Sequence, residues 1–331
     1  MAEGRFNNPV IAALHGFLDL FRKQELADRF LPTDRFDGKT VLVTGANSGL
    51  GFAIAVEAAR RGAQVIMACR RQIPEAGEKV KKLSRSDQVV MKYLDLSKID
   101  TIHDFVSDLK AQGTVLDVVY LNAASAAPKS RKTPSGLDEL FLVNYFSNFI
   151  LSNLLLTKKL IIPSVDKQPR LIFISSDSHR DSSAIDYDEF GKYFEYGISK
   201  AISNYSYFKL VLNTFATELS RRINETEVSV QVNCICPGPV NTNIIKETPW
   251  LIRIMLRAIF TIIFRSPPKA VLPVIYMGSS ADFRDTTNQY LHMFIKKRMD
   301  EKVYDQKEGM SLWEASELLW KGLDKQADTA L

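Results

Sequence analysis

The chain has 331 residues, of which 46% are hydrophobic and 24% charged. This is the makeup of an ordinary globular protein that can bury a sizeable core. Its 43 basic and 38 acidic residues are dispersed and give a net charge of only +5, which argues against nucleic-acid binding, because that function favours clustered positive charge.

The cysteines and histidines exclude two further kinds of site. Cys69, Cys234 and Cys236 form an odd set without a secretory framework, which indicates a reducing compartment. The four histidines are scattered without ligand spacing, so we expect no metal site. No uninterrupted apolar run reaches the roughly 18 residues that span a bilayer, and the N-terminus lacks a signal-peptide pattern. We therefore expect a cytoplasmic protein, with attachment to a membrane surface left open.

Residues 1–37 are expected to form an N-terminal extension. Apolar residues recur at helical spacing within Pro9–Phe30, which predicts an amphipathic helix. Basic residues do not dominate its polar face, which favours docking on the domain or on a partner over contact with a membrane surface.

Short apolar runs alternate with longer helical patterns from Lys39 to about Phe294. This alternation is typical of a parallel sheet covered by helices on both faces, and the continuous hydrophobicity of the runs indicates buried strands. We expect residues 38–300 to form a single α/β domain with a Rossmann-like, doubly wound sheet of seven mainly parallel strands. The expected strands are Thr40–Thr44, Gln64–Cys69, Val89–Leu94, Asp117–Leu121, Arg170–Ser175, Val228–Ile235 and Gln289–Phe294.

A glycine-rich turn follows the first expected strand and leads into a helix expected over Phe52–Arg61. The turn reads Thr44-Gly45-Ala46-Asn47-Ser48-Gly49-Leu50-Gly51. Glycines between a strand and a helix let backbone N–H groups approach a pyrophosphate, whose charge the helix N-terminus favours. The placement of this G-x-x-x-G-x-G pattern predicts a dinucleotide site.

The residues after the second strand bear on the choice of cofactor. A site for NAD(H) usually has an acidic residue there, which binds the ribose hydroxyls. This chain has Cys69-Arg70-Arg71 instead, and a guanidinium suits a 2′-phosphate. We therefore expect NADP(H) rather than NAD(H), with Arg70 contacting the phosphate; a solvated surface charge is the alternative.

Two tyrosine–lysine pairs with the spacing Y-x-x-x-K lie in one helical run, and each pair shares a helix face. A nearby ammonium favours the phenolate and lowers a tyrosine pKa, ordinarily about 10, toward a range useful for proton transfer. Tyr196 and Lys200 open the run. Because Tyr205 and Lys209 come about two turns deeper, we expect them to pack in the interior, and we assign the chemistry to Tyr196 and Lys200.

The insert 241–266 has an unusual helical pattern. Within Trp250–Arg265 a polar residue recurs every four positions while nearly all the others are apolar, which predicts a helix with one thin polar stripe. The segment 249–265 is too short to span a membrane, so we expect it to cap a hydrophobic pocket as a lid or to dip into a membrane interface. Residues 301–331 are expected to form a C-terminal helical tail.

Several motifs between about Lys39 and Trp320 resemble those of the short-chain dehydrogenases/reductases, and they occur in that family's order. The glycine turn resembles the family's cofactor loop. Leu121-Asn122-Ala123-Ala124 resembles its N-N-A-G motif, with two departures that leave Asn122 in place. The other matches are Asp95-Leu96 for the adenine contact, Leu142-Val143-Asn144 and Ile174-Ser175-Ser176 for two catalytic residues, and Pro237-Gly238-Pro239-Val240-Asn241-Thr242 for the P-G-x-V-x-T cofactor motif.

The resemblance implies a role for each of these residues. Tyr196 would be the general acid or base, and Lys200 would lower its pKa and hold the ribose. Only one of Ser175 and Ser176 can face the site, and the family pattern selects Ser176, which would polarise the carbonyl oxygen. Asn144 would hold a proton-relay water. The implied cofactor contacts are Gly45, Asn47, Ser48, Gly49, Leu50, Gly51, Arg70, Asp95, Leu96, Asn122, Tyr196, Lys200, Pro237, Gly238, Val240 and Thr242.

The retinol-dehydrogenase-like branch of the family is the most similar, because of the basic residue after the second strand, the apolar insert and Leu312-Trp313-Glu314. This likeness implies hydride transfer between NADP(H) and a hydrophobic alcohol, ketone or aldehyde. Two alternatives stay open: reduction of a C=C bond in an enone or porphyrin-type ring, as in the protochlorophyllide reductases, and a non-catalytic cofactor-binding scaffold. A homodimer through the helices that bear Asn144 and Tyr196 is also implied, unless the N-terminal extension blocks it.

Overall fold

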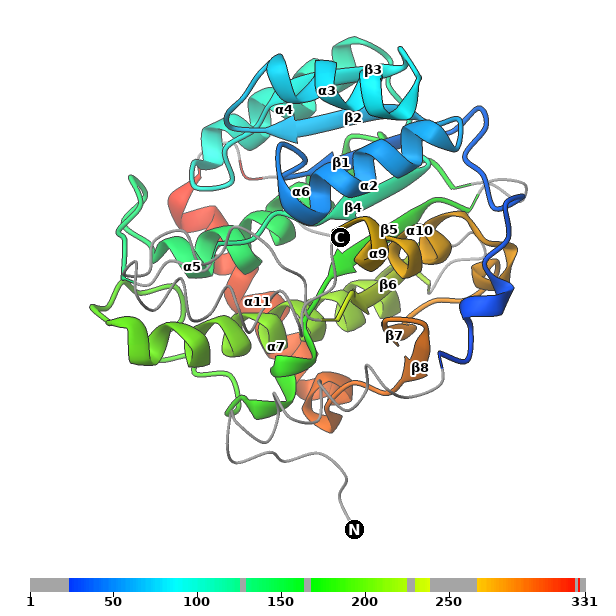
Figure 1. The fold of residues 1–331 in the computed structure, drawn as a ribbon. Coiled ribbons are helices and arrows are strands. Elements are labelled where there is room, and N and C mark those ends of the chain that lie inside the picture. The colour runs from blue at the N-terminus through cyan, green and yellow to red at the C-terminus, as the bar shows by residue number, and fades with distance from the viewer. Residues whose placement is uncertain are drawn as a thin grey trace.

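The computed structural model describes residues 24–125, 129–163, 168–224, 230–238, 267–324 and 327. Eight strands within these residues form one sheet in the order β3-β2-β1-β4-β5-β6-β7-β8 (Figure 1). All neighbours pair in parallel except β7 and β8, which are antiparallel. The strands are β1 Thr40–Thr44, β2 Gln64–Cys69, β3 Val89–Tyr93, β4 Val118–Leu121, β5 Arg170–Ile174, β6 Gln231–Cys236, β7 Tyr290–His292 and β8 Ile295–Lys297. The expected Rossmann-like α/β fold is confirmed.

Helices cover both faces of this sheet, and the alternation of side chains along each strand divides the core in two. In β1, Val41 and Val43 pack with residues of α2, α3 and α10, whereas Leu42 packs with residues of α4, α6 and α7. The helices are α2 Gly49–Arg60, α3 Glu75–Ser84, α4 Ile99–Ala111, α5 Glu139–Phe141, α6 Ser147–Thr157, α7 Ile198–Ile223, α9 Pro267–Ala270, α10 Leu272–Ser279 and α11 Gln306–Leu323. Shorter turns are η1 Ala27–Arg29, the π-helical η2 Leu142–Phe146, η3 Asp177–Asp181, η5 Ala281–Phe283 and η6 Glu301–Tyr304.

The sheet has one strand more than the seven expected. The run expected as Gln289–Phe294 is the three-residue β7, and the chain then turns back as β8. Strand β8 is short and carries Lys296 and Lys297, so it lacks the apolar pattern by which the other strands were predicted. Strands β1 and β2 have the expected bounds.

The described end of the N-terminal extension, residues 24–30, docks on the sheet domain. The backbone N–H of Leu26 donates to the carbonyl of Phe294 at 3.0 Å, and the N–H of Phe294 donates to Gln24 Oε1 at 3.2 Å. The ring of Phe30 packs against Tyr276, and the guanidinium of Arg61 lies 4.3 Å from its centre. These contacts hold the end of the extension beside the β7–β8 turn.

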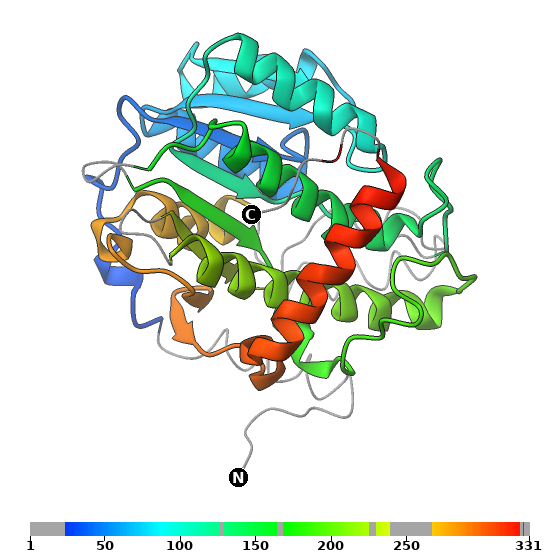
Figure 2. The same ribbon diagram turned by 180° about the vertical axis from the view of Figure 1, so that it is seen from behind.

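The C-terminal helix α11 lies across α7 and α6 on the far face of the domain (Figure 2). The ring of Trp313 lies 5.2 Å from Phe149 of α6 and 5.9 Å from Phe215 of α7. Trp320 lies further along α11, is fully buried and also packs against Phe149. In the described residues, Glu139–Thr157 is long and apolar enough to cross a membrane, but 89% of it is buried inside the domain, as in a core helix.

Candidate active site

The turn between β1 and α2 depends on its glycines. Gly45 and Gly49 have φ angles of +66° and +59°, a left-handed conformation that favours glycine. A Cβ atom on Gly51 would lie 2.4 Å from Asn122 Nδ2 and 2.5 Å from the carbonyl oxygen of Gly45. No side chain at these positions covers the backbone at the start of α2. The helix N-terminus therefore suits a pyrophosphate.

Asn122 and Thr44 join the end of β4 to this glycine turn. Asn122 Nδ2 donates to the carbonyl of Thr44 at 2.9 Å. The hydroxyl of Thr44 accepts from the backbone N–H groups of Asn122 and Ala123, at 2.9 and 3.0 Å. Two adjacent parallel strands are therefore fixed at their carboxyl ends, the edge at which open α/β sheets bind ligands.

Arg70 and Asp95 lie together where the adenosine of a dinucleotide would bind. Arg70 Nη1 is 3.8 Å from Asp95 Oδ1, and 42% of the Arg70 side chain is exposed. Asp95 also accepts from the N–H and hydroxyl of Ser97. The site therefore has an accessible guanidinium, and together with the glycine turn it fits an anionic dinucleotide cofactor.

The other predicted cofactor contacts on this side have different surroundings. Asn47 Nδ2 donates to Gln72 Oε1 at 3.1 Å, which links the glycine turn to the loop after β2. Ser48 is exposed just before α2, and Leu50 is buried in its first turn. Leu96 is buried, and its carbonyl accepts from the hydroxyl of Ser147.

Asn144 lies in the π-helical turn η2, a kind of local bulge that is frequent at functional sites. Its side chain is buried, and Oδ1 accepts from the N–H of Ser125 at 2.8 Å while Nδ2 donates to the Ser125 carbonyl at 2.9 Å. The side chain of Asn144 therefore stabilises the loop that follows β4.

Ser176 lies two residues beyond Ile174, the last residue of β5. Its side-chain oxygen accepts from the hydroxyl of Ser178 at 3.0 Å. Ser175 is 4% exposed, whereas Ser176 is partly exposed. Of the two serines, Ser176 is thus the more accessible residue.

Tyr196 and Lys200 do not form the pair that the sequence predicted. The Tyr196 hydroxyl is buried without a hydrogen-bond partner in the described part of the chain, and Lys200 is exposed. Burial raises the pKa of Tyr196 above its usual range, and the charges of Asp138 and Glu139 raise it further. The expectation that Lys200 lowers this pKa is wrong, because the phenol lies near two carboxylates instead.

Tyr205 and Lys209 lie at the carboxyl edge of the sheet, beside the end of β5. Lys209 is 2% exposed, and its ammonium donates to the carbonyl of Ile174 at 2.7 Å. It also lies 5.6 Å from the centre of the partly exposed Tyr205 ring. Burial lowers the pKa of Lys209 to about 8. The structure therefore brings this second pair, rather than Tyr196 and Lys200, to the strand end that carries Ser176.

The geometry of α7 explains why the choice between the pairs was difficult. Its 26 residues span about 39 Å, whereas the five residues of β5 span about 17 Å. The helix therefore begins well beyond the sheet edge, and its first turn is not level with that edge. One signal in the sequence favoured the second pair: Lys209 interrupts the apolar run Phe208–Leu212, and a lysine in a buried stretch is rare without a function.

The P-G motif is described only in part. Gly238 has a φ of +81°, and a Cβ atom there would lie 2.9 Å from Met293, so glycine is needed at this position. Val240 and Thr242, the other two contacts predicted from this motif, lie outside the described residues. The expected lid at 249–265 and most of Pro9–Phe30 lie outside them too.

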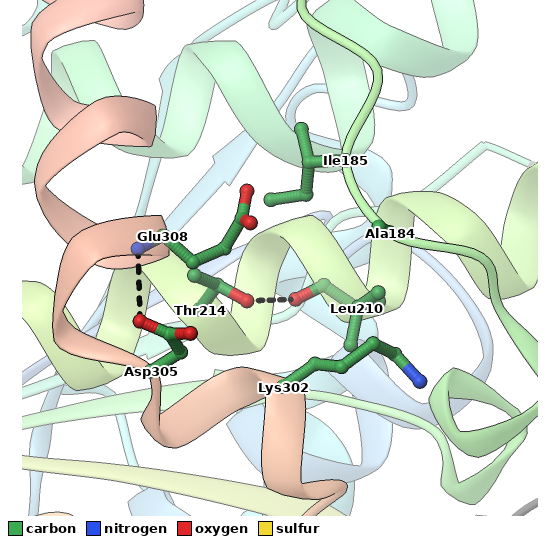
Figure 3. Close-up of a pocket in the computed structure, with 7 residues that line it drawn as sticks. All are labelled: Ala184, Ile185, Leu210, Thr214, Lys302, Asp305 and Glu308. Carbon is green, nitrogen blue, oxygen red and sulfur yellow. Dashed lines mark hydrogen bonds between the residues drawn. The ribbon is translucent and has the colours of Figure 1, made fainter.

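A small pocket between α7 and α11 is separate from this edge (Figure 3). Its polar groups mostly serve the local backbone: Thr214 donates to the carbonyl of Leu210, and Asp305 accepts from the N–H of Glu308. The lining residues are Ala184, Ile185, Leu210, Thr214, Lys302, Asp305 and Glu308. None of them is a predicted site residue, so we assign this pocket no catalytic role.

Comparison with known proteins identifies the family. A family model described as short chain dehydrogenase matches residues 39–186. Human retinol dehydrogenase 14 is 30% identical over 94% of this chain and 96% of its own length. The chain belongs to the short-chain dehydrogenase family. It is therefore an oxidoreductase that acts on CH–OH groups, in a family that uses NAD(H) or NADP(H).

Other relatives of this short-chain dehydrogenase agree with its fold and branch. Human retinol dehydrogenase 13 is 30% identical over 84% of this chain and 83% of its own length. A solved structure from Mycobacterium paratuberculosis has a TM-score of 0.66 at 24% identity, covering 87% of this chain and 95% of the other. The Pseudomonas aeruginosa RhlG/NADP complex has a TM-score of 0.58 at 22% identity, covering 79% and 97%. The family-model match ends at residue 186, before either tyrosine–lysine pair.

Proposed function

We propose that this short-chain dehydrogenase uses NADP(H) to interconvert a hydrophobic alcohol and its ketone or aldehyde, with Tyr205 as the general acid or base. The observation that carries the proposal is the Lys209 ammonium at the end of β5, beside Tyr205 and next to Ser175 and Ser176. The sequence-based prediction of Tyr196 and Lys200 is the competing assignment.

Two observations support the cofactor and the substrate class. The exposed guanidinium of Arg70 at the end of β2 suits a 2′-phosphate and thus NADP(H). The relatives include retinol dehydrogenases and human polyprenol dehydrogenase, which is 28% identical over 84% of this chain. Their names indicate lipophilic alcohols, in keeping with the apolar insert of this chain.

The residues at the sheet edge would divide the chemistry among them. A bound nicotinamide supplies or accepts the hydride. The hydroxyls of Ser176 and Tyr205 stabilise the negative charge that develops on the substrate oxygen. Burial raises the pKa of Tyr205, so the phenol keeps its proton at neutral pH and can donate it to the oxygen of a carbonyl that is being reduced. In the reverse direction the phenolate takes the proton from the alcohol.

Lys209 would hold charge at this site. Its ammonium is fixed by the Ile174 carbonyl, so it can stabilise a Tyr205 phenolate when the proton has left and can contact a ribose hydroxyl. The arrangement thus supplies a proton donor, a cation and a polarising hydroxyl on one edge of the sheet.

A pair of matched substitutions tests the proposal. NADPH absorbance is followed with retinal and with other lipophilic aldehydes and ketones, for the wild type, Tyr205→Phe and Tyr196→Phe. We expect Tyr205→Phe to lower kcat at least about 100-fold, because it removes the proton donor. Tyr196→Phe should change kcat by no more than about threefold, and NADPH binding should persist in both variants.

Other outcomes would assign a different function. A loss confined to Tyr196→Phe would show that Tyr196 and Lys200 carry the chemistry. Turnover of enones with reduction of the C=C bond, and none of simple ketones, would favour the C=C reductase. Tight NADPH binding without turnover of any of these substrates would favour the scaffold protein.

A further inference from the structure

The carbonyl group of Ser176 is held by a buried histidine that the proposed chemistry does not use. His179 is fully buried in η3, and its Nδ1 lies 2.7 Å from the carbonyl oxygen of Ser176. The backbone N–H of His179 donates to the same oxygen at 3.2 Å. Two donors from one residue thus converge on the backbone of the serine that would polarise the substrate.

The second ring nitrogen fixes the tautomer of His179. Nε2 accepts from the backbone N–H of Asp300 at 3.1 Å. Because a backbone N–H can only donate, Nε2 carries no proton, and the proton of a neutral ring lies on Nδ1, where it can donate to Ser176. Burial lowers the pKa of His179 to about 4, so the ring stays neutral at physiological pH.

The neighbouring residue, Asp177, is held from the same side. Asp177 Oδ1 accepts from Tyr290 Oη at 3.0 Å and from Arg180 Nε at 3.1 Å. Its other oxygen lies 3.7 Å from both His292 Nδ1 and Lys297 Nζ. The ring of Tyr290 also packs edge-on against that of His179, at 5.4 Å between centres.

These contacts join the end of β5 to β7, β8 and Asp300, three parts of the chain far from it in sequence. Ser176 itself has an extended backbone, with φ −145° and ψ 142°. Since the direction of the Cα–Cβ bond follows from the backbone, fixing the carbonyl of Ser176 and the carboxylate of Asp177 also fixes the position of the Cβ atom that carries the serine hydroxyl.

We propose that His179 is a positioning residue: its Nδ1–H holds the Ser176 carbonyl so that the serine hydroxyl meets the substrate oxygen. The inference rests on the proposed function, in which Ser176 polarises a carbonyl. Tyr290 supports the same backbone through its hydrogen bond to Asp177, so removing its hydroxyl should weaken the arrangement more gently.

Two substitutions separate the roles of the two ring nitrogens. In His179→Asn the amide nitrogen can take the place of Nδ1, so the contact to Ser176 is retained and kcat should stay within about threefold of the wild type. In His179→Gln the amide reaches the position of Nε2, so the contact to Ser176 is lost and kcat should fall about 10- to 100-fold. The KM for NADPH should not change in either variant. His103→Gln is the matched control, because His103 is also buried but contacts Asp324.

A double-mutant cycle asks whether the effect passes through Ser176. If it does, adding His179→Gln to Ser176→Ala should lower kcat by less than about twofold further. Full additivity of the two losses, or an equal loss in His179→Asn and His179→Gln, would overturn the proposal. If His179→Gln does not fold, Tyr290→Phe decides: kcat should fall about three- to tenfold at unchanged KM for NADPH, and an unchanged kcat would refute the positioning role.

Amide hydrogen exchange tests the contact without any turnover. The peptide that covers Ser175–Ser182 should exchange at least about tenfold faster in His179→Gln than in the wild type, and at the wild-type rate in His179→Asn. Equal exchange in all three proteins would overturn the proposal. If no carbonyl is turned over at all, the proposed function fails, while exchange still decides whether His179 holds this strand end.

Discussion

The ammonium nitrogen of Lys209 lies 2.7 Å from the carbonyl oxygen of Ile174, the residue before Ser175 and Ser176. A charge with 2% of its residue exposed is costly to bury, and one carbonyl compensates only part of that cost. Selection for stability alone would place an apolar residue at position 209, like the neighbouring Phe208 and Leu210. The position of Lys209 is therefore best explained by its chemistry.

The cost of burying Lys209 can be measured. Its pKa falls from 10.5 to about 8, mainly through burial. A base with a lowered pKa in the folded state contributes stability above its unfolded pKa, and that stability is lost as the pH falls through about 8. At pH 7, Lys209→Met should therefore raise the free energy of unfolding by about 1–3 kcal/mol, while kcat falls at least about 100-fold. Urea unfolding and NADPH turnover measure the two effects.

Lys200→Met is the control for that experiment. Lys200 is exposed, so its replacement should change the free energy of unfolding by no more than about 0.5 kcal/mol and leave turnover intact. Loss of turnover in Lys200→Met with normal activity in Lys209→Met would contradict the assignment of Tyr205 and Lys209.

Asp138 should make the protein less stable as the pH rises. Its side chain is fully buried at the start of α5, Oδ1 accepts from the N–H groups of Leu140 and Phe141, and Oδ2 has no partner within the described residues. Burial raises its pKa from 3.8 to about 6. For a raised pKa, the stabilising contribution is complete below the unfolded value of 3.8 and is lost as the pH rises through about 6.

Asp138→Asn removes this titration and keeps the capping oxygen for Leu140 and Phe141. We expect the variant to be about 1–3 kcal/mol more stable than the wild type at pH 7 and nearly equal at pH 4, measured by urea unfolding at both values. Asp305→Asn, at the exposed start of α11, should change the free energy of unfolding by less than about 0.5 kcal/mol. A difference at Asp138 that is the same at both pH values would refute the explanation.

Arg70 should determine the preference for NADP(H). Removing its guanidinium in Arg70→Ala should raise the Kd for NADPH about tenfold or more, because a charged hydrogen bond to the 2′-phosphate is lost. The Kd for NADH should stay within about twofold. Fluorescence titration with both cofactors measures this, with Arg71→Ala, also exposed, as the matched variant. Equal weakening of both cofactors, or a larger effect of Arg71→Ala, would speak against the assignment.

Trp320 should contribute strongly to the attachment of α11. Its ring is fully buried against Phe149, and Nε1 donates to Asp324 Oδ2 at 2.8 Å. Trp320→Ala should lower the free energy of unfolding by about 3–5 kcal/mol, as expected for a large side chain removed from a core. Leu318, in the same helix, is 75% exposed, and its replacement by alanine should cost less than about 0.5 kcal/mol. Similar losses in the two variants would show that α11 is not held by its buried face.

Strands β1, β2, β4, β5 and β6 were predictable to within a few residues because they are buried on both sides. Val41, Leu42 and Val43 alternate between the two halves of the core, so the whole run must be apolar and is easily recognised. Apolar patterning does not predict β8, because its pairing with β7 depends on backbone hydrogen bonds and a turn rather than on apolar side chains.

The site was predictable where it follows from local sequence. The glycine turn depends on the backbone of Gly45, Gly49 and Gly51, and its position between β1 and α2 is set by neighbours in the chain. The choice between Tyr196 and Tyr205 depends on how far α7 extends beyond the sheet, which is a tertiary property. Spacing alone cannot distinguish two pairs within one helical pattern, and it does not show that α7 begins only at Ile198, after Tyr196.

The covering of α6 and α7 by α11 has a consequence for assembly. Phe149 and Phe215, which two exposed helices would offer to a neighbouring molecule, are occupied by Trp313 of the same polypeptide. The hydrophobic surface of α6 and α7 is thus covered within one molecule. A second copy would have to displace the C-terminal helix α11 before it could bind there. We therefore expect any pairing of two copies to use another face of the molecule.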